Sequence, residues 1–218
     1  MSKIALSGDA SGTGTFTIAS PNSNSNYTLT LPQATTTVVG TDATQTLTNK
    51  TLGSGLVMGA SAITSGSSQA STSGTSIDFT GIPSWVKRIT VILNGVSTNG
   101  SSSLRLQLGD SGGIETTGYS NLSCQMANSW SGAATSSSGF DGYGDGGSTF
   151  LRSGQLVFTT LGSNIWTLVG AYTIANGSAF SYFFTGIKTL SDTLTQVRIT
   201  TVNGTDTFDA GSINILYE

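Results

Sequence analysis

The sequence predicts an all-β protein in which an extended, intertwined N-terminal β segment precedes a C-terminal antiparallel β-sandwich that is jelly-roll-like. Three observations predict this fold. Apolar residues alternate with polar ones wherever they gather, and no stretch keeps the recurrence of an amphipathic helix for more than a turn or two. Asn-Gly pairs, which favour tight turns between strands, punctuate the later stretches at residues 94–95, 99–100, 176–177 and 203–204.

The N-terminal segment, residues 1–65, is rich in Thr, Ser, Gly and Asn and carries only thin apolar faces. Its alternating apolar residues are Phe16, Ile18, Tyr27, Leu29 and Leu31. Such a segment alone buries too little apolar surface to offset the entropy of ordering it. We therefore expect these residues to wrap around identical strands or to attach to a larger particle.

Residues 66–75 are small and polar and predict a linker, after which the sandwich spans residues 76–218. Alternation strengthens from Ser76, and the clearest strand has Leu104, Leu106 and Leu108 alternating with polar residues. Eight or so short strands at this spacing are typical of a sandwich. The expected strands cover residues 77–79, 86–93, 104–108, 155–158, 166–174, 180–184, 197–202 and 213–217.

Composition excludes several classes of protein and site. Charged residues make up only 9% of the chain, which excludes a coiled coil, and a net charge of -3 with eight Lys and Arg argues against a nucleic-acid partner. Histidine is absent, so a His-dependent triad and a His-ligated zinc are impossible. The single cysteine, Cys124, is expected to be a small buried hydrophobe. We expect no metal and no cofactor.

The sequence also predicts no membrane insertion. No apolar run approaches the roughly 20 residues of a membrane span, and the N-terminus lacks the continuous apolar core of a signal peptide. We therefore expect a protein that is made in the cytoplasm.

A Gly-rich run at residues 139–147, GFDGYGDGG, is the most site-like passage. Asp141 and Asp145 offer carboxylate oxygens to a cation, although no later acidic residue completes a known calcium loop. Alternatively, Phe140, Tyr143 and the nearby Trp130 stack on sugar rings, since loop aromatics make binding surfaces. A third interpretation is a loop that binds nothing, in which the glycines only permit tight turns and the aromatic residues pack on the sandwich.

Catalysis is not expected. Residues 109–113 spell GDSGG, the letters around a trypsin-like nucleophile, but no histidine exists to activate Ser111. Asp206 and Asp209, with Glu115 on a loop, are conceivable carboxylates for glycoside cleavage, yet the segment around them equally predicts a turn.

Several strings resemble fibre and tail proteins of tailed bacteriophages. Two lie in the N-terminal segment, at residues 27–32 (YTLTLP) and 44–52 (TQTLTNKTL). Three lie in the sandwich, at residues 81–91 (GIPSWVKRITV), 109–119 (GDSGGIETTGY) and 205–218 (TDTFDAGSINILYE). The resemblance implies a virion component made in the host cytoplasm and assembled as a homotrimer with other virion proteins. It implies that the sandwich faces outward, toward a host-surface glycan as a partner.

Two alternatives stay open beside a tail fibre with a receptor-binding domain. One is a capsid decoration or head fibre protein, attached through residues 1–65, that stabilises the shell. The other is a spike that degrades glycans. On the fibre interpretation, Trp130, Phe140, Asp141, Tyr143 and Asp145 are the expected ligand contacts, and Phe16, Ile18, Tyr27, Leu29 and Leu31 are the expected virion-attachment residues.

Overall fold

A computed structural model describes residues 11–15, 17, 22–26, 28, 63–126, 131–174 and 180–218. The chain divides into two units, Met1–Leu56 and Val57–Glu218. Every described residue of the first unit is exposed. The expected attachment residues, Phe16, Ile18, Tyr27, Leu29 and Leu31, lie outside the described residues.

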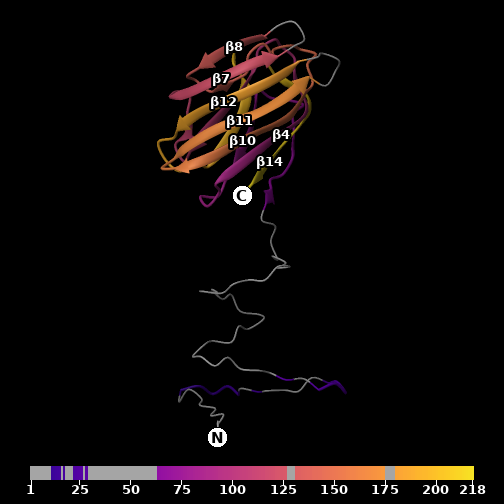
Figure 1. The fold of residues 1–218 in the computed structure, drawn as a ribbon, viewed down its shortest axis with the longest axis vertical. Coiled ribbons are helices and arrows are strands. Elements are labelled where there is room, and N and C mark those ends of the chain that lie inside the picture. Colours follow the sequence, from indigo (N-terminus) through magenta and orange to yellow (C-terminus); the bar gives the residue numbers. More distant parts are fainter. Residues whose placement is uncertain are drawn as a thin grey trace. The chain divides into compact units, whose positions relative to one another are not determined.

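The second unit consists of two antiparallel sheets, and its described residues contain no helix (Figure 1). The larger sheet contains β1 (Thr64–Ser65), β2 (Gln69–Ala70), β4 (Arg88–Thr98), β7 (Tyr119–Met126), β8 (Ser131–Ser136), β10 (Arg152–Gly162), β11 (Ile165–Ile174), β12 (Ser181–Thr189) and β14 (Phe208–Tyr217). The smaller sheet contains β3 (Ser76–Thr80), β5 (Leu104–Asp110), β6 (Gly113–Ile114), β9 (Phe140–Asp141) and β13 (Gln196–Thr201). The all-β prediction is confirmed.

Strand pairing is nested in the way of a jelly roll. β10 pairs with β11, β7 with β12, β5 with β13 and β4 with β14, so each pair encloses the previous one along the chain. Three of these pairs lie in the larger sheet, whose order is β1-β14-β4-β10-β11-β12-β7-β8, with β2 also on β14. The pair β5–β13 lies in the smaller sheet, whose order is β3-β13-β5-β6, with β9 also on β5.

The core lies between the two sheets and follows the predicted alternation. Leu104, Leu106 and Leu108 of β5 are fully buried, and they belong to the same hydrophobic cluster as the inward residues of β4 and β10. Because successive side chains of a strand point to opposite faces, Arg105 and Gln107 are turned to the outer face of the smaller sheet. The alternation within each strand thus determines both which side chains fill the core and which lie on the surface.

The sandwich begins earlier than expected. β1 and β2 pair with β14, and the Ser71 hydroxyl donates to the Ala210 carbonyl at 2.8 Å. Gly66 also joins β14, since its N–H donates to Ile215 O at 2.8 Å. Part of the expected linker of residues 66–75, namely β2 with Gly66 and Ser71, therefore lies along β14, because small residues can lie flat along an edge strand.

The Asn-Gly signals have different outcomes. Asn203 and Gly204 form a turn, in which the Gly204 N–H donates to Thr201 O at 3.0 Å. Asn94 and Gly95 instead lie inside β4, where the register with β14 and β10 shifts and Gly95 takes a φ of 63°. A glycine of positive φ there makes a β-bulge rather than a chain reversal.

Candidate functional site

The Gly-rich run places Phe140 in the core rather than on the surface. Its ring is fully buried and makes an edge-on contact with Tyr119 at a centroid distance of 5.0 Å. β9 pairs with β5, Phe140 lying opposite Leu106. The expected contact of Phe140 with a ligand is therefore corrected, because a strand pairing that local sequence does not reveal turns this aromatic residue inward.

Asp145 is also removed from the candidate surface contacts, since its side chain and that of Arg152 are both fully buried. Its Oδ2 accepts hydrogen bonds from Leu104 N at 3.2 Å, Arg152 Nε at 3.3 Å and the Tyr172 hydroxyl. Burial, together with the Asp145 charge, raises the pKa of Tyr172 well above its usual value. Asp145 thus connects the loop by hydrogen bonds to three strands, β5, β10 and β11.

Tyr143 and Asp141 are the described members of the predicted site that keep some exposure. Tyr143 lies against β8, where a side chain in place of Gly132 would collide with its ring. Trp130 lies outside the described residues. Asp141 belongs to a different cluster, on the outer face of the smaller sheet.

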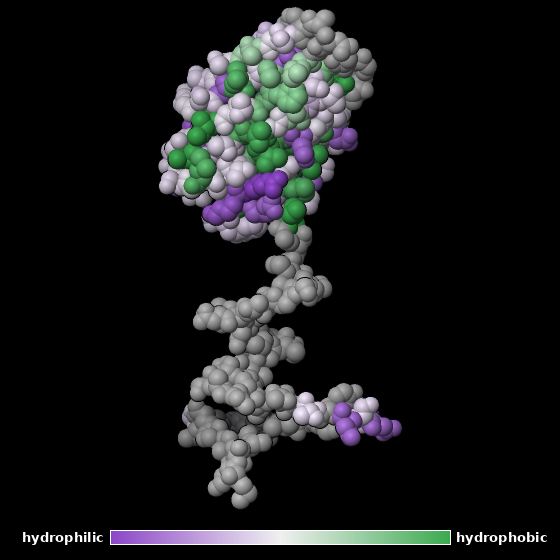
Figure 2. Space-filling model, viewed as in Figure 1, coloured by the Kyte–Doolittle hydropathy of each residue, from purple (hydrophilic) through white to green (hydrophobic). Residues whose placement is uncertain are grey.

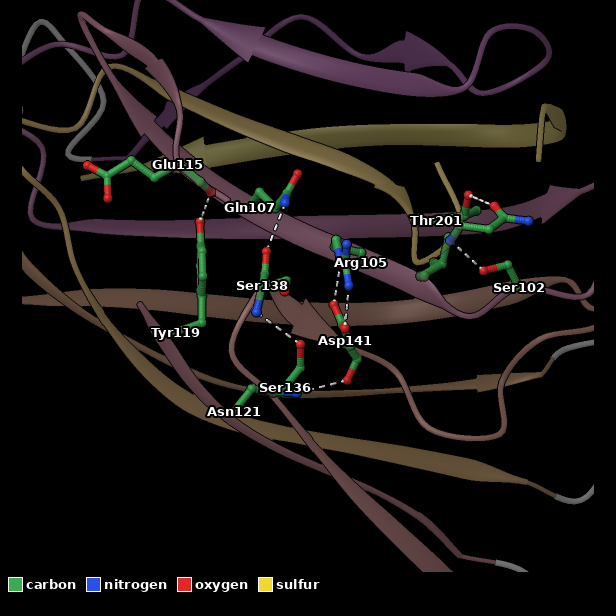
Figure 3. Close-up of polar contacts among 12 residues, drawn as sticks. Ser102, Arg105, Gln107, Glu115, Tyr119, Asn121, Ser136, Ser138, Asp141 and Thr201 are labelled. Atoms are coloured by element: carbon green, nitrogen blue, oxygen red, sulfur yellow. Dashed lines mark hydrogen bonds and ion pairs between the residues drawn. The ribbon is translucent and has the colours of Figure 1, made fainter. Parts of the chain in front are cut away.

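Two arginine–carboxylate pairs organise that outer face. Arg105 of β5 donates from Nε and Nη2 to the two carboxylate oxygens of Asp141, at 2.6 and 2.7 Å (Figure 3). Arg198 of β13 holds Asp78 of β3 in the same way, with both distances 2.7 Å. The carboxylate hydrogen bonds raise the pKa of both arginines, despite partial burial that acts against the cation. Each guanidinium is therefore fixed in orientation and charge.

Strand register brings the polar side chains of this face together. Arg105 lies opposite Thr200, and Gln107 lies opposite Arg198, so four polar residues of β5 and β13 form one block. Gln107 donates to Ser138 O at 2.9 Å, and Thr200 donates to Thr75 O at 2.8 Å. Neither arginine uses its Nη1 for a hydrogen bond to a described residue. The Nη1 groups of the two arginines thus remain able to donate hydrogen bonds to a ligand.

A depression of about 300 Å³ opens beside the two arginines. Its lining is polar apart from one valine and consists of Thr75, Ser76, Arg105, Gln107, Arg198, Thr200, Thr201, Val202, Asn203 and Gly204. Among the lining residues, Gln107 and Thr200 are buried, while the arginines remain partly exposed. We call this the polar depression.

The turn at the rim of the polar depression is tied down by Asp206. Asp206 accepts hydrogen bonds from Asn203 Nδ2 at 2.6 Å and from Ser102 N at 2.9 Å. Ser102 in turn accepts from Asn203 N at 3.0 Å, beside Thr201 (Figure 3). The Asn203 hydrogen bond, with that from Ser102, lowers the pKa of Asp206. Asp206 therefore stabilises the conformation of this turn through hydrogen bonds. Asp209 lies exposed on β14.

The rim lies at the opposite end of the sandwich from the point where the chain enters it. β1 pairs with the last residues of β14, Thr64 lying opposite Tyr217. The turn of residues 202–206 instead leads into the first residue of β14, Phe208. A ten-residue strand spans about 30 Å, so the depression rim is well separated from the entry point.

The arrangement suits a neutral, hydroxyl-rich ligand. Its two cations are each balanced by a carboxylate, so a polyanion gains little net attraction. Guanidinium, amide and hydroxyl groups can exchange several hydrogen bonds with a sugar, each contributing about 0.5–1.5 kcal/mol or more when one partner is charged. Among the described residues, no group of three or more Asp, Glu, Cys or His gathers to hold a metal ion.

Sequence reasoning missed Arg105, Gln107, Arg198, Thr200 and Asn203. One signal was present, because the alternation of β5 and β13 with buried Leu, Val and Ile puts these polar residues on the outer faces of their strands. That β5 and β13 are neighbours was not readable from local pattern.

No protein-family model matches the chain, and comparison with curated proteins and with solved structures finds no match either. In the part of the chain that the structure describes, no helix has the length and apolar character needed to cross a membrane.

Proposed function

We propose that this chain is a bacteriophage virion fibre protein, a homotrimeric tail fibre whose sandwich is displayed for host adhesion. The polar depression carries this proposal. It combines fixed hydrogen-bond donors with balanced charge, and it lies at the end of the sandwich opposite the entry of the chain. The resemblance of residues 81–91, 109–119 and 205–218 to phage fibre strings supports the same assignment.

In this proposal the ligand is a host-surface glycan, and the protein binds it without cleaving it. Asp78 and Asp141 are each held by both oxygens in an arginine pair, which suits orientation of a guanidinium better than proton transfer to a leaving group. The other partners are copies of the same chain and the virion proteins that anchor it.

Location on the virion tests the proposal. Gold-labelled antibody against residues 76–218, viewed on intact virions by electron microscopy, is expected at the tail or its appendages. Label distributed over the head would contradict the tail-fibre assignment and favour the capsid decoration protein, with shell stabilisation as its role.

Substitution of one arginine tests the polar depression itself. Arg198→Gln removes a charged donor from the depression, and we expect binding to host polysaccharide and virion adsorption to weaken about tenfold or more. Arg88→Gln is the matched control, because it breaks another partly exposed arginine–carboxylate pair, with Glu218, on the larger sheet. Equal adsorption of the two variants would contradict the assignment, and equal unfolding midpoints would show that stability is not the cause.

A further inference from the structure

The outer face of the larger sheet is an uncharged surface across five adjacent strands, β10-β11-β12-β7-β8. Outward side chains of these strands alternate with the buried ones, and none of them is Asp, Glu, Lys or Arg. The two charged residues of these strands, Arg152 and Lys188, are both buried inward. Figure 2, viewed as Figure 1, shows apolar residues over this face and the hydrophilic ones gathered mainly toward its lower margin.

Five large apolar side chains project from this face, each between 39% and 64% exposed. They are Leu122, Met126, Val169, Phe183 and Ile187. Strand register makes them one patch, since Thr185 lies between Leu122 and Val169, and Phe183 lies opposite Cys124. Contiguous apolar surface of this kind marks an interaction site rather than ordinary scatter.

We infer that this uncharged face packs against another copy of the same chain. The inference supplies the contact surface for the proposed homotrimer and rests on that part of the proposed function. A face without charge needs a partner surface without charge, because an unpaired charge buried against it would lose its hydration. The same face on neighbouring copies meets that requirement when three copies turn it toward a common threefold axis, whereas the outer face of the smaller sheet presents arginines and carboxylates.

The size of the face also fits self-association. Strands lie about 4.8 Å apart and rise about 3.3 Å per residue, so five strands of about nine residues offer a footprint of roughly 700 Å². A stable protein interface buries about 800 Å² on each partner. Around a threefold axis the face is shared between two neighbours, so it supplies somewhat under half of each such contact.

Cys124 provides a probe within the face. The sequence predicted a buried position for it, but its side chain is turned to the outer face of β7 and is partly exposed. It lies between Ala133 of β8 and Phe183 of β12. Packing of another copy on this face must cover its thiol.

The test measures mass and thiol reactivity on the full-length chain. We expect light scattering to give a multiple of the 22.2 kDa chain, and Phe183→Glu to shift it toward the single-chain mass. Alkylation of Cys124 by N-ethylmaleimide should be roughly tenfold or more faster in that variant, since a covered thiol reacts only after dissociation. Val169→Glu, a second charge on the same face, should repeat both effects.

Leu161→Glu is the matched control, because Leu161 is highly exposed but lies at the β10–β11 turn, away from the patch. An oligomer that survives both face substitutions with a reactive Cys124 would overturn the inference and leave the homotrimer intact. A wild-type chain of single-chain mass would overturn both, even if its thiol were protected by residues 1–62. Glycan binding is measured separately, through Arg198, so its failure would not be confused with either outcome.

Discussion

Asp145 and Arg152 form an ion pair that is closed off from solvent inside the sandwich. Arg152 also donates to the Asp145 and Phe150 carbonyls, so the cation holds the backbone of the loop as well as the carboxylate. In the described residues, Asp145 Oδ1 has no hydrogen-bond partner. The cost of removing both charges from water offsets much of their attraction, so such a pair adds little net stability, whereas loss of one partner leaves the other charge buried and unpaired.

Asp145→Asn tests this pair. The amide keeps the shape of the side chain but leaves the Arg152 charge uncompensated, so we expect the free energy of unfolding to fall by about 3–5 kcal/mol. Urea unfolding followed by tryptophan fluorescence measures the change. Asp209→Asn, at an exposed aspartate, should stay within about 0.5 kcal/mol of the wild type. Similar midpoints for the two variants would contradict a structural role for Asp145.

Tyr182 makes stability depend on pH in the alkaline range. Its hydroxyl donates to Gly144 O at 3.1 Å and accepts from Gln125 Nε2 at 2.9 Å. Burial, reinforced by the Asp145 charge, raises the pKa of Tyr182 to about 12. The fold therefore favours the protonated phenol, and this stabilisation is present below about pH 10 and is lost as pH rises toward 12.

We expect the urea midpoint of the wild type to fall across that window and the midpoint of Tyr182→Phe to fall less. Tyr172 keeps part of the effect in the variant, because its pKa is raised in the same direction. Ultraviolet absorbance of tyrosinate, recorded in parallel, links the fall to ionisation. Identical pH profiles for the two proteins would refute the role of Tyr182.

At the scale of elements, the two-residue strand β9 connects the core to the polar depression. The buried ring of Phe140 holds β9 against the core. The next residue, Asp141, accepts a hydrogen bond from Arg105 on the outer face. The packing of Phe140 depends on Gly186 of β12, where an added Cβ would approach the Phe140 ring to 2.8 Å and Ser120 O to 2.6 Å. A backbone oxygen cannot swing away as a flexible side chain can, so this close approach requires glycine.

Gly186→Ala should therefore displace β9. We expect a loss of about 1–3 kcal/mol from overpacking and, if the proposed function holds, a weaker affinity for host polysaccharide, because Asp141 no longer orients Arg105. Unfolding and binding assays together measure the two effects. Gly14→Ala, at a site with nothing within 4 Å, is the control. Wild-type behaviour of Gly186→Ala in both assays would show that β9 does not support the depression.

At the scale of the whole molecule, the sandwich has two outer faces of opposite character. The smaller sheet presents paired arginines and carboxylates, while five strands of the larger sheet present no charge. Both faces arise from the same alternation, which reserves every second side chain for the outside. The proposed fibre function requires association between copies and recognition of a host, and the two faces are separate candidate surfaces for these two roles.

The sequence by itself determined the fold class and most strands. Alternation such as that of Leu104, Leu106 and Leu108 is a local property, and it reports directly which side chains face the core. The absence of histidine likewise excluded whole classes of chemistry without any structure. These conclusions need no knowledge of which strands are neighbours.

Only the tertiary structure decided which residues make the site. Gly-rich composition suggested that Phe140 and Asp145 reach the surface, but pairing of β9 with β5 and a buried partner, Arg152, draw them inside. Conversely, Arg105 and Arg198 come together because β5 and β13, far apart in the chain, are adjacent in the smaller sheet. Nested pairing is set by long-range packing of the whole sandwich, and local sequence carries no record of it.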